Sequence, residues 1–317
     1  MPTLPALILS REAERLGSAR ELRRQHARGL LTRVFPGIYL PTGEWNALDA
    51  DGRYRLRVRA AALRSSPDAQ FSHDSAAALY RLPTVGAWPD VVHETVIPSG
   101  GGTSRSGILR HGLGLDPSPR RMDGVTLTSL PRTLVDIGRS TTFVRAVAMA
   151  DHAMRPAKEG EPGWDLGLPV VSRGAMLAVI DGLGDQRGLE AARRVAEFAD
   201  GRSGSPLESV GRVQFHALGL PTPELQVGFS DGSGFIGFAD FYWRELDLIV
   251  EVDGRSKYGS GRHFQQGMTP DEILWNEKRR EDRLRRVVRS FARLDAAILY
   301  DRRGLAARLG AYGLVTA

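Results

Sequence analysis

The sequence contains no cysteine among its 317 residues. This absence excludes disulfide bonds, cysteine nucleophiles and thiolate zinc sites. Histidine is scarce as well, and no two histidines form a short-spaced ligand pair, so the sequence does not predict a zinc enzyme. The seven are His26, His73, His93, His111, His152, His216 and His263.

Long apolar runs are also lacking. No stretch approaches the ~20 apolar residues that a membrane span requires. The N-terminal run Leu4–Leu9 is short and has no basic region before it, so it does not resemble a signal peptide. We therefore expect a cytoplasmic protein without a membrane partner.

The composition is that of an ordinary globular chain, with 42% hydrophobic and 25% charged residues. Its length predicts two domains, each large enough for a core. The net charge is +6 and the sequence pI about 9.9. A basic balance favours a polyanionic partner, although charge alone indicates only weak attraction.

Carboxylates are concentrated in the stretch Gly237–Tyr258, which reads GFADFYWRELDLIVEVDGRSKY and predicts two strands. Side chains of a strand point alternately to its two faces. In the second strand one face would be apolar, with Leu246, Leu248, Val250 and Val252. The other face would be mainly acidic, with Asp247, Ile249, Glu251 and Asp253. A tight turn at Arg244-Glu245 would place Asp240 opposite Ile249. Glu251 would then lie diagonally from Asp240 on one face, about 7–8 Å away.

Clustered carboxylates repel one another and are costly to desolvate. A hard divalent cation, which prefers oxygen ligands, is the usual compensation. The alternative is a solvated sheet face balanced by nearby arginines. The acids here follow a buried-type run and precede a glycine and a lysine, so the sequence predicts a metal site.

The residues Asp240, Glu251-Val252-Asp253-Gly254 and Lys257-Tyr258 resemble the PD-(D/E)xK nuclease core. The closest likeness is to an uncharacterised family similar to very-short-patch-repair endonucleases, and residues 277–282 (EKRRED) continue it. The resemblance runs from about Ser205 to the C-terminus. It implies a mixed β-sheet flanked by helices that hydrolyses DNA phosphodiesters with Mg²⁺ or Mn²⁺.

This resemblance also implies residue roles. Asp240 and Glu251 would hold the metal ion, with the carbonyl oxygen of Val252 as a further ligand. Asp253, where the parent pattern has lysine, would orient the attacking water or bind a second ion. Lys257, or else Lys278, would supply the missing cation; without it the domain would be catalytically inactive.

Two further polar residues have alternative explanations. Glu208 lies in a predicted capping box that begins at Ser205, which would explain its carboxylate structurally. The nuclease resemblance instead places an acid of this helix at the metal site. Gln226 lies in the next predicted strand, Leu225–Phe229, either at the position of a polar family residue or as an ordinary strand-surface glutamine.

A long helix is predicted from the capping box Thr269–Glu272 to about Val288. Its many cations suggest contact with a nucleic-acid backbone, while i,i+4 ion pairs explain about half of them. They are Lys278, Arg279, Arg280, Arg283, Arg285, Arg286 and Arg289. After this helix we expect a strand at Ala296–Tyr300 and a helix at Leu305–Tyr312.

The N-terminal region predicts a winged helix. A short helix ends at Gly17, and a capping box from Ser18 to Glu21 starts a second helix. A hairpin with a Pro-Gly turn follows over Leu30–Leu40. The second helix suits a DNA recognition helix, or alternatively an ordinary solvated face, through its exposed arginines Arg20, Arg23, Arg24 and Arg28.

Residues 1–155 resemble the AbiEi-type antitoxin fold, a winged helix followed by a mixed α/β region. The likeness rests on the arginine-rich helix, the hairpin, Phe71–Ala77 (FSHDSAA) and Leu127–Asp136 (LTSLPRTLVD). It implies a toxin as a partner. The expected divisions are a winged helix (1–48), an α/β region (49–155), a linker with a helical connector (156–203) and a nuclease-like domain (204–317).

Together these patterns predict a multidomain α+β and α/β protein. The expected function is a metal-dependent DNA endonuclease targeted by a winged helix, in DNA repair or in defence against phages and mobile elements. The alternative is a non-catalytic antitoxin or transcriptional regulator with a degenerate nuclease domain.

Overall fold

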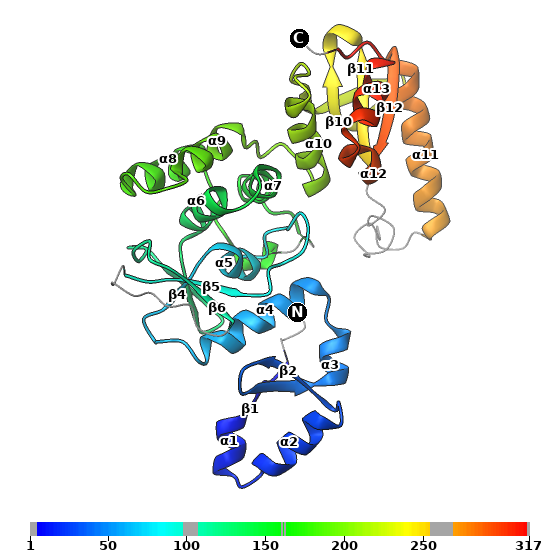
Figure 1. The fold of residues 1–317 in the computed structure, drawn as a ribbon. Coiled ribbons are helices and arrows are strands. Elements are labelled where there is room, and N and C mark those ends of the chain that lie inside the picture. Colours follow the sequence, from blue (N-terminus) through cyan, green and yellow to red (C-terminus); the bar gives the residue numbers. More distant parts are fainter. Residues whose placement is uncertain (1–4, 98–106, 160, 162, 254–268, 316–317) are drawn as a thin grey trace. The chain divides into compact units, whose positions relative to one another are not determined.

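A computed structural model describes residues 5–97, 107–159, 161, 163–253 and 269–315, and Figure 1 shows it as a ribbon. The protein is a mixed α/β protein whose described residues form three β-sheets. Its contacts divide it into a first unit, Met1–Ser140 with Gly174–Arg193, and a second unit, Thr141–Arg173 with Arg194–Ala317. These bounds differ from the expected ones at 155 and 203.

Two segments account for the difference: residues 174–193 of the connector belong to the first unit, and residues 141–155 belong to the second. The helix α7 (Phe143–Ala153) was assigned to the N-terminal region, but it packs against α10 (Pro206–Ala217). The carboxylate of Asp151 on α7 accepts a hydrogen bond of 2.7 Å from Arg212 on α10. This buried contact joins α7 to the second unit.

The first unit begins with the two predicted helices and the predicted hairpin, β2 and β3, to which an unpredicted first strand adds to give an antiparallel sheet of order β1-β3-β2. Ala13, Leu22 and Leu31 form its small core. The short helix α3 was not predicted. The elements are β1 (Ile8–Leu9), α1 (Ser10–Arg15), α2 (Ala19–Ala27), β2 (Leu31–Phe35), β3 (Ile38–Pro41) and α3 (Thr42–Ala47).

The capping box predicted at the start of α2 is not formed. The Ser18 side chain accepts no bond from the helix; its hydroxyl instead donates to the carbonyl oxygen of Ala13 at 3.1 Å. The Glu21 carboxylate accepts from Gln25 at 3.0 Å and pairs with Arg24. Contacts with the preceding turn and the helix surface therefore replace the cap.

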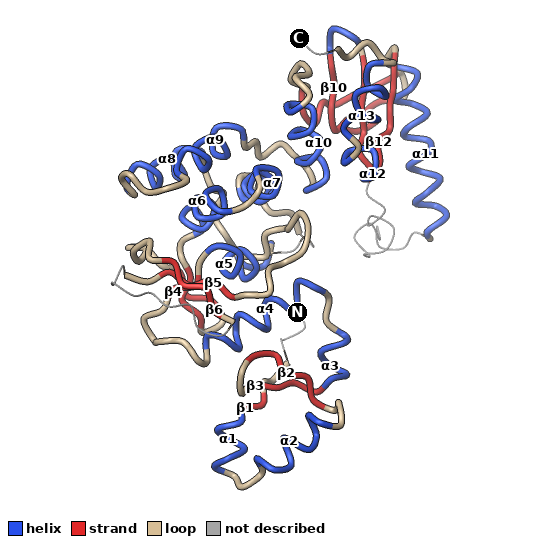
Figure 2. Tube along the Cα trace, in the orientation of Figure 1, coloured by secondary structure: helices blue, strands red, loops and turns tan. Residues whose placement is uncertain are grey.

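A five-stranded sheet of order β6-β5-β4-β8-β7 follows in the same unit, and Figure 2 shows its strands in red. The helices α4 and α5 pack against β5 of this sheet, and α6 packs against α5. The elements are α4 (Ala50–Ala62), β4 (Gln70–Phe71), α5 (His73–Leu79), β5 (Val92–Thr95), β6 (Ile108–His111), β7 (Arg120–Met122), β8 (Val125–Leu127) and α6 (Leu130–Ser140). The predicted helical connector forms α8 (Arg173–Gly182) and α9 (Leu189–Phe198).

The second unit contains a four-stranded sheet of order β12-β11-β10-β9. The strands β9, β10 and β11 form an antiparallel meander, and α11 then returns the chain so that β12 lies parallel to β11. The elements from α10 onward are β9 (Glu224–Asp231), β10 (Gly234–Trp243), β11 (Leu248–Asp253), α11 (Pro270–Val287), β12 (Ser290–Asp295), α12 (Ala296–Tyr300) and α13 (Arg302–Gly310). The predicted capping box of α11 is confirmed at Thr269 and Glu272.

The predicted turn of the acidic hairpin is wrong. A 3₁₀ turn, η2 (Arg244–Leu246), and Asp247 at φ 45° lengthen the connection. The strands consequently pair Tyr242 with Ile249, so Asp240 is not opposite Ile249. Continuing this register places Asp240 beside Glu251.

The second acidic strand is also more buried than its alternation predicts. Ile249, on the parity expected to be acidic, is fully buried in a cluster with Leu284 of α11. Both faces of β11 are thus covered, as is common for central strands that have a parallel neighbour. The Glu251 carboxylate consequently lies in a buried environment instead of on an open acidic face.

The last predicted strand is a helix. Ala296–Tyr300 forms α12, and the strand lies directly before it at Ser290–Asp295. The Asp295 side chain accepts a hydrogen bond of 2.9 Å from the amide of Ile298, which caps α12. Among the described residues, no helix is both long enough and apolar enough to cross a membrane.

Candidate functional site

Three side chains from α10, β9 and β10 meet at one side of the second unit's sheet. The Gln226 amide nitrogen donates to Oε2 of Glu208 at 3.0 Å and to Oδ1 of Asp240 at 3.4 Å. Gln226 has φ 51°, a backbone conformation that non-glycine residues rarely adopt. The polar role considered for Gln226 is therefore the one its contacts favour: it bridges two carboxylates.

Glu208 is part of a helix cap and of this cluster at the same time. The Ser205 hydroxyl accepts from the amide of Glu208 at 3.2 Å, which confirms half of the predicted capping box. The Glu208 carboxylate accepts from the amide of Gly204 at 2.6 Å, one residue before the cap. Its other contact, with Gln226, points toward the acidic strands.

Asp240 is fixed against the neighbouring strand. Its Oδ2 accepts a hydrogen bond of 2.9 Å from the backbone amide of Val252. This bond orients the carboxylate across the sheet toward β11. It involves the N–H of Val252, so the metal contact expected of its carbonyl oxygen stays a prediction.

Glu251 is the most buried acid of the acidic hairpin, with 4% of its surface exposed. Its Oε1 lies 2.7 Å from Nη2 of Arg280 on α11, and its Oε2 lies 3.4 Å from Nη2 of Arg293 on β12. Burial raises the pKa of Glu251, Arg280 opposes this shift, and the like charge of Asp240 adds to it. A positive charge beside Glu251 therefore stabilises the ionised form of its carboxylate.

Asp253 and Glu277 extend the acidic cluster. Arg293 lies 3.8 Å from Oδ2 of Asp253 and 3.2 Å from Oε1 of Glu277. An arginine thus faces Asp253, where the nuclease pattern would have a lysine on the strand itself. Lys257 lies outside the described residues.

The carboxylates are hard oxygen donors, which suit Mg²⁺ or Mn²⁺. However, Glu208, Asp240 and Glu251 do not have ligand atoms within 4.8 Å of one another, a criterion that three histidines alone meet in the described part of the chain. The Gln226 amide and the Arg280 guanidinium lie among the carboxylates instead. In this arrangement the carboxylates have the chemistry of a divalent-ion site but not its close spacing, and Arg280 occupies Glu251.

Several cations of α11 make internal ion pairs. Besides Arg280, Arg283 contacts Asp231 of β9 at 2.6 Å, and Arg285 contacts Glu281 at 2.6 Å. Lys278, Arg279 and Arg286 are exposed. Of these pairs only Arg285–Glu281 has the expected i,i+4 spacing, and the contact of the exposed cations with a nucleic acid stays a prediction.

The arginines of α2 lie on the surface of the first unit. Arg20, Arg23 and Arg24 on α2 and Arg28 at its C-terminal end are all exposed. Arg24 pairs with Glu21 on the same helix. An exposed basic helix before a hairpin is the arrangement that major-groove binding requires.

The first unit contains a cluster that sequence spacing did not indicate. His73 at the start of α5, His93 on β5 and His111 on β6 have ligand atoms within 4.8 Å of one another. Nδ1 of His93 lies 2.9 Å from Nε2 of His111, and the His73 ring stacks on His111 with centroids 3.8 Å apart. Short-spacing rules fail here because a helix start and two parallel strands bring together successive histidines that are 20 and 18 positions apart.

His73 is buried, whereas His93 and His111 are partly exposed. Nδ1 of His73 lies 2.9 Å from the Ser72 hydroxyl, and His73 is 2% exposed. Burial lowers the pKa of His73 well below its usual value and the pKa of His111 to about 4. Both rings are therefore neutral near pH 7, the form that binds metals.

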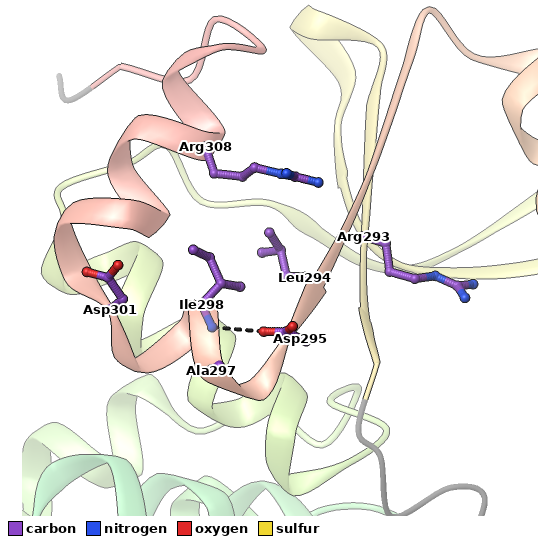
Figure 3. A pocket seen from close by; sticks show the side chains of 7 residues that line it. All are labelled: Arg293, Leu294, Asp295, Ala297, Ile298, Asp301 and Arg308. Atoms are coloured by element: carbon purple, nitrogen blue, oxygen red, sulfur yellow. Dashed lines mark hydrogen bonds between the residues drawn. The ribbon is translucent and has the colours of Figure 1, made fainter.

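A cavity of about 440 Å³ in the second unit lies against β12, α12 and α13 (Figure 3). Its lining includes Asp295 and Asp301, which cap α12 and α13, together with Arg293 and Arg308. Arg293 contributes to this cavity and also to the acidic cluster. The acids of the cavity thus have structural explanations.

No family model matches the chain. It is 30% identical over 134 residues to the uncharacterized protein Rv2248 of Mycobacterium tuberculosis strain ATCC 25618 / H37Rv, a match that covers 42% of this chain. The uncharacterized protein MT2308 of strain CDC 1551 / Oshkosh matches with the same identity and coverage. The match spans about half the length of these relatives, 45% of each.

Proposed function

We propose that the second unit is a Mg²⁺- or Mn²⁺-dependent endonuclease that cleaves DNA phosphodiesters. The observation that carries this proposal is the convergence of Glu208, Asp240 and Glu251 from three separate elements: the amide of Gln226 links the first two, and Glu251 feels the charge of Asp240. Acids gathered from a helix and two neighbouring strands, with Glu208 and Glu251 buried, match a metal-dependent hydrolase better than a structural ion-pair network.

The charge of the cluster supports this proposal. The guanidinium groups of Arg280 and Arg293 contact four carboxylates, on Glu251, Asp253, Glu277 and Glu281. Burial raises the pKa of Glu251, and the like charge of Asp240 adds to this shift. A divalent cation would relieve both the repulsion and the desolvation of these acids.

Asp240 and Glu251 would hold the ion, with Glu208 positioned behind Asp240 through Gln226. The ion, when bound, supplies a water of lowered pKa and neutralises charge on the phosphoryl oxygens. Asp253 would orient that water, and Arg280, released from Glu251, would contact the phosphate through its planar guanidinium. Lys257 remains the candidate for a cation at the transition state.

The winged helix would deliver this activity to DNA. Exposed Arg20, Arg23 and Arg28 suit the phosphates that flank a major groove. Lys278, Arg279 and Arg286 on α11 would contact the backbone near the acidic cluster. DNA is thus the proposed partner, and the antitoxin-like pattern adds a toxin as a proposed protein partner.

Nicking of supercoiled plasmid tests the proposal. The purified full chain is incubated with Mg²⁺, with Mn²⁺ and with EDTA, next to Glu251→Gln. Glu224→Gln is the matched control, since Glu224 makes an exposed pair with Arg244 in the same sheet. We expect metal-dependent nicking that is lost in Glu251→Gln and kept in Glu224→Gln.

The second candidate is a non-catalytic DNA-binding antitoxin or regulator with a degenerate nuclease domain. Two observations favour it. Arg280 already neutralises Glu251. Asp253 occupies the position of the expected lysine, and the cation that faces it is Arg293 of the neighbouring strand. DNA retention in EDTA, with no nicking in either metal, would replace the nuclease proposal by this one.

A further inference from the structure

We infer that His73, His93 and His111 form a binding site for a transition-metal ion of the Zn²⁺ type in the first unit. This site is separate from the acidic cluster of the second unit and does not depend on its activity. Three imidazoles are the ligand set of many zinc sites, and they suit Zn²⁺, Cu²⁺ and Ni²⁺ better than Mg²⁺.

The scaffold holds the ligands on regular elements. His93 and His111 project from the paired parallel strands β5 and β6, and His73 occupies the first position of α5. His73 has φ 49°, so its backbone is strained in order to place the ring. Strain of this kind is concentrated at sites that bind or react.

The distances are close to those a tetrahedral ion requires. Zn–N bonds of about 2.0–2.1 Å imply ligand nitrogens about 3.3 Å apart. Nδ1 of His93 and Nε2 of His111 are already 2.9 Å apart, held by one shared proton that a metal ion would replace. The His73 ring stacks on His111, and a ligand nitrogen of His73 lies within 4.8 Å of ligand nitrogens of the other two histidines.

Partners around the rings support this assignment. The Ser72 hydroxyl contacts Nδ1 of His73 and thereby leaves Nε2 of that ring for the metal. The Ser75 hydroxyl accepts from the backbone amide of His93 at 2.8 Å and lies 3.2 Å from the Tyr54 hydroxyl. These contacts hold two of the three proposed ligand residues, His73 and His93, in position.

Nearby cations do not oppose a bound ion strongly. Arg132 and Arg139 are close enough to affect His73, but both pair with the buried carboxylate of Asp136, at 3.1 Å and 3.7 Å. Arg110 likewise pairs with the buried Glu94. The cluster therefore faces charges that are already balanced.

Calorimetric titration of EDTA-stripped full-length protein with Zn²⁺ tests the inference, with Co²⁺ absorption as a probe of ligand geometry. We expect one Zn²⁺ per chain, a higher unfolding temperature that EDTA reverses, and the intense visible bands of tetrahedral Co²⁺. His93→Gln and His111→Gln should each abolish the stoichiometric binding. Ser72→Ala should weaken it about tenfold or more.

His216→Gln is the matched control, because His216 is exposed on α10 in the second unit. Equal Zn²⁺ binding by the wild type and by the His93 and His111 variants, or none by the wild type, would overturn the inference. The cluster would then be a hydrogen-bonded group of neutral histidines. If a variant fails to fold, ¹⁵N resonances of the wild-type histidine rings replace it, and unshifted resonances on Zn²⁺ addition count against the site.

Discussion

Nη2 of Arg280 lies 2.7 Å from Oε1 of Glu251, so a guanidinium from α11 neutralises a buried carboxylate of the central strand β11. Glu277, one turn earlier on α11, holds Arg280 in this position through bonds of 3.1 Å. Sequence patterns assigned Glu251 to a metal and Arg280 to DNA. In the folded chain the two residues bind each other.

Arg280→Ala should lower the free energy of unfolding by about 3 kcal/mol, because it leaves a buried carboxylate without its main counter-ion. Urea unfolding measures the change, and Arg279→Ala, exposed on the same helix, should cost less than about 0.5 kcal/mol. Mg²⁺ should stabilise Arg280→Ala more than the wild type. Equal effects of Mg²⁺ on both would argue against an ion at Glu251.

Asp151→Ala should cost about 3–5 kcal/mol in unfolding free energy, because it strands a buried arginine. The Asp151 carboxylate accepts from Arg212, from the Ser209 hydroxyl and from the amide of Asp200, all within 2.8 Å. Asp181→Ala is the control, since its pair with Arg193 is exposed and is worth less than about 1 kcal/mol. Similar denaturation midpoints for both variants would contradict the buried network.

Gly201→Ala should destabilise the second unit by about 1–3 kcal/mol through overpacking. A Cβ atom at Gly201 would lie within 2.2 Å of the carbonyl oxygen of Met154, which is backbone and cannot move aside cheaply. Gly182→Ala has open space at the end of α8 and should be neutral or stabilise by about 0.5 kcal/mol. Thermal unfolding of the two variants compares them directly, and a neutral Gly201→Ala would refute this contact.

The first unit should lose stability as the pH falls from 6.5 toward 4. The His111 ring takes up a proton near pH 6.5 when unfolded, but burial lowers its folded pKa to about 4, so the unfolded state binds more protons in this window. After allowance for solvent screening of this partly exposed ring, the loss is about 1–2 kcal/mol.

Asp136 acts in the opposite direction, because burial raises its folded pKa to about 6 and the folded state then holds more protons as the pH falls. The difference between the wild type and His111→Gln isolates the histidine contribution. Guanidinium unfolding at several pH values should show a flatter pH dependence for the variant. Parallel curves would mean that His111 is protonated equally in both states.

Arg20→Ala combined with Arg23→Ala should weaken DNA binding and lower the slope of log K against log salt by about 2, one phosphate contact for each arginine. Arg193→Ala, which removes an arginine already paired with Asp181, should leave the slope unchanged. Fluorescence anisotropy over a salt series measures both. An unaltered slope in the double variant would remove α2 from the DNA interface.

Local signals were sufficient for much of the architecture. The hairpin after α2, the Thr269–Glu272 capping box and the long helix α11 followed from turn residues, capping residues and apolar periodicity. The assignment failed at Asp295, where a capping side chain ended the strand and started α12. The short apolar run Ala296–Tyr300 favoured a strand, whereas the capping preference of Asp295 favoured the start of a helix. Both are local features of the sequence, and here they competed.

By itself, the sequence determined which chemistry the chain can carry: no thiol, an acidic strand pair at Asp240 and Glu251, and exposed basic helices. Only the tertiary structure decided which of these groups meet. The bridge of Gln226 between two acids, the contact of Arg280 with Glu251 and the cluster of His73, His93 and His111 all join residues from different elements. Periodicity and capping act over a few residues, whereas such contacts depend on strand order, register and the length of each turn, which are set by packing of the whole sheet.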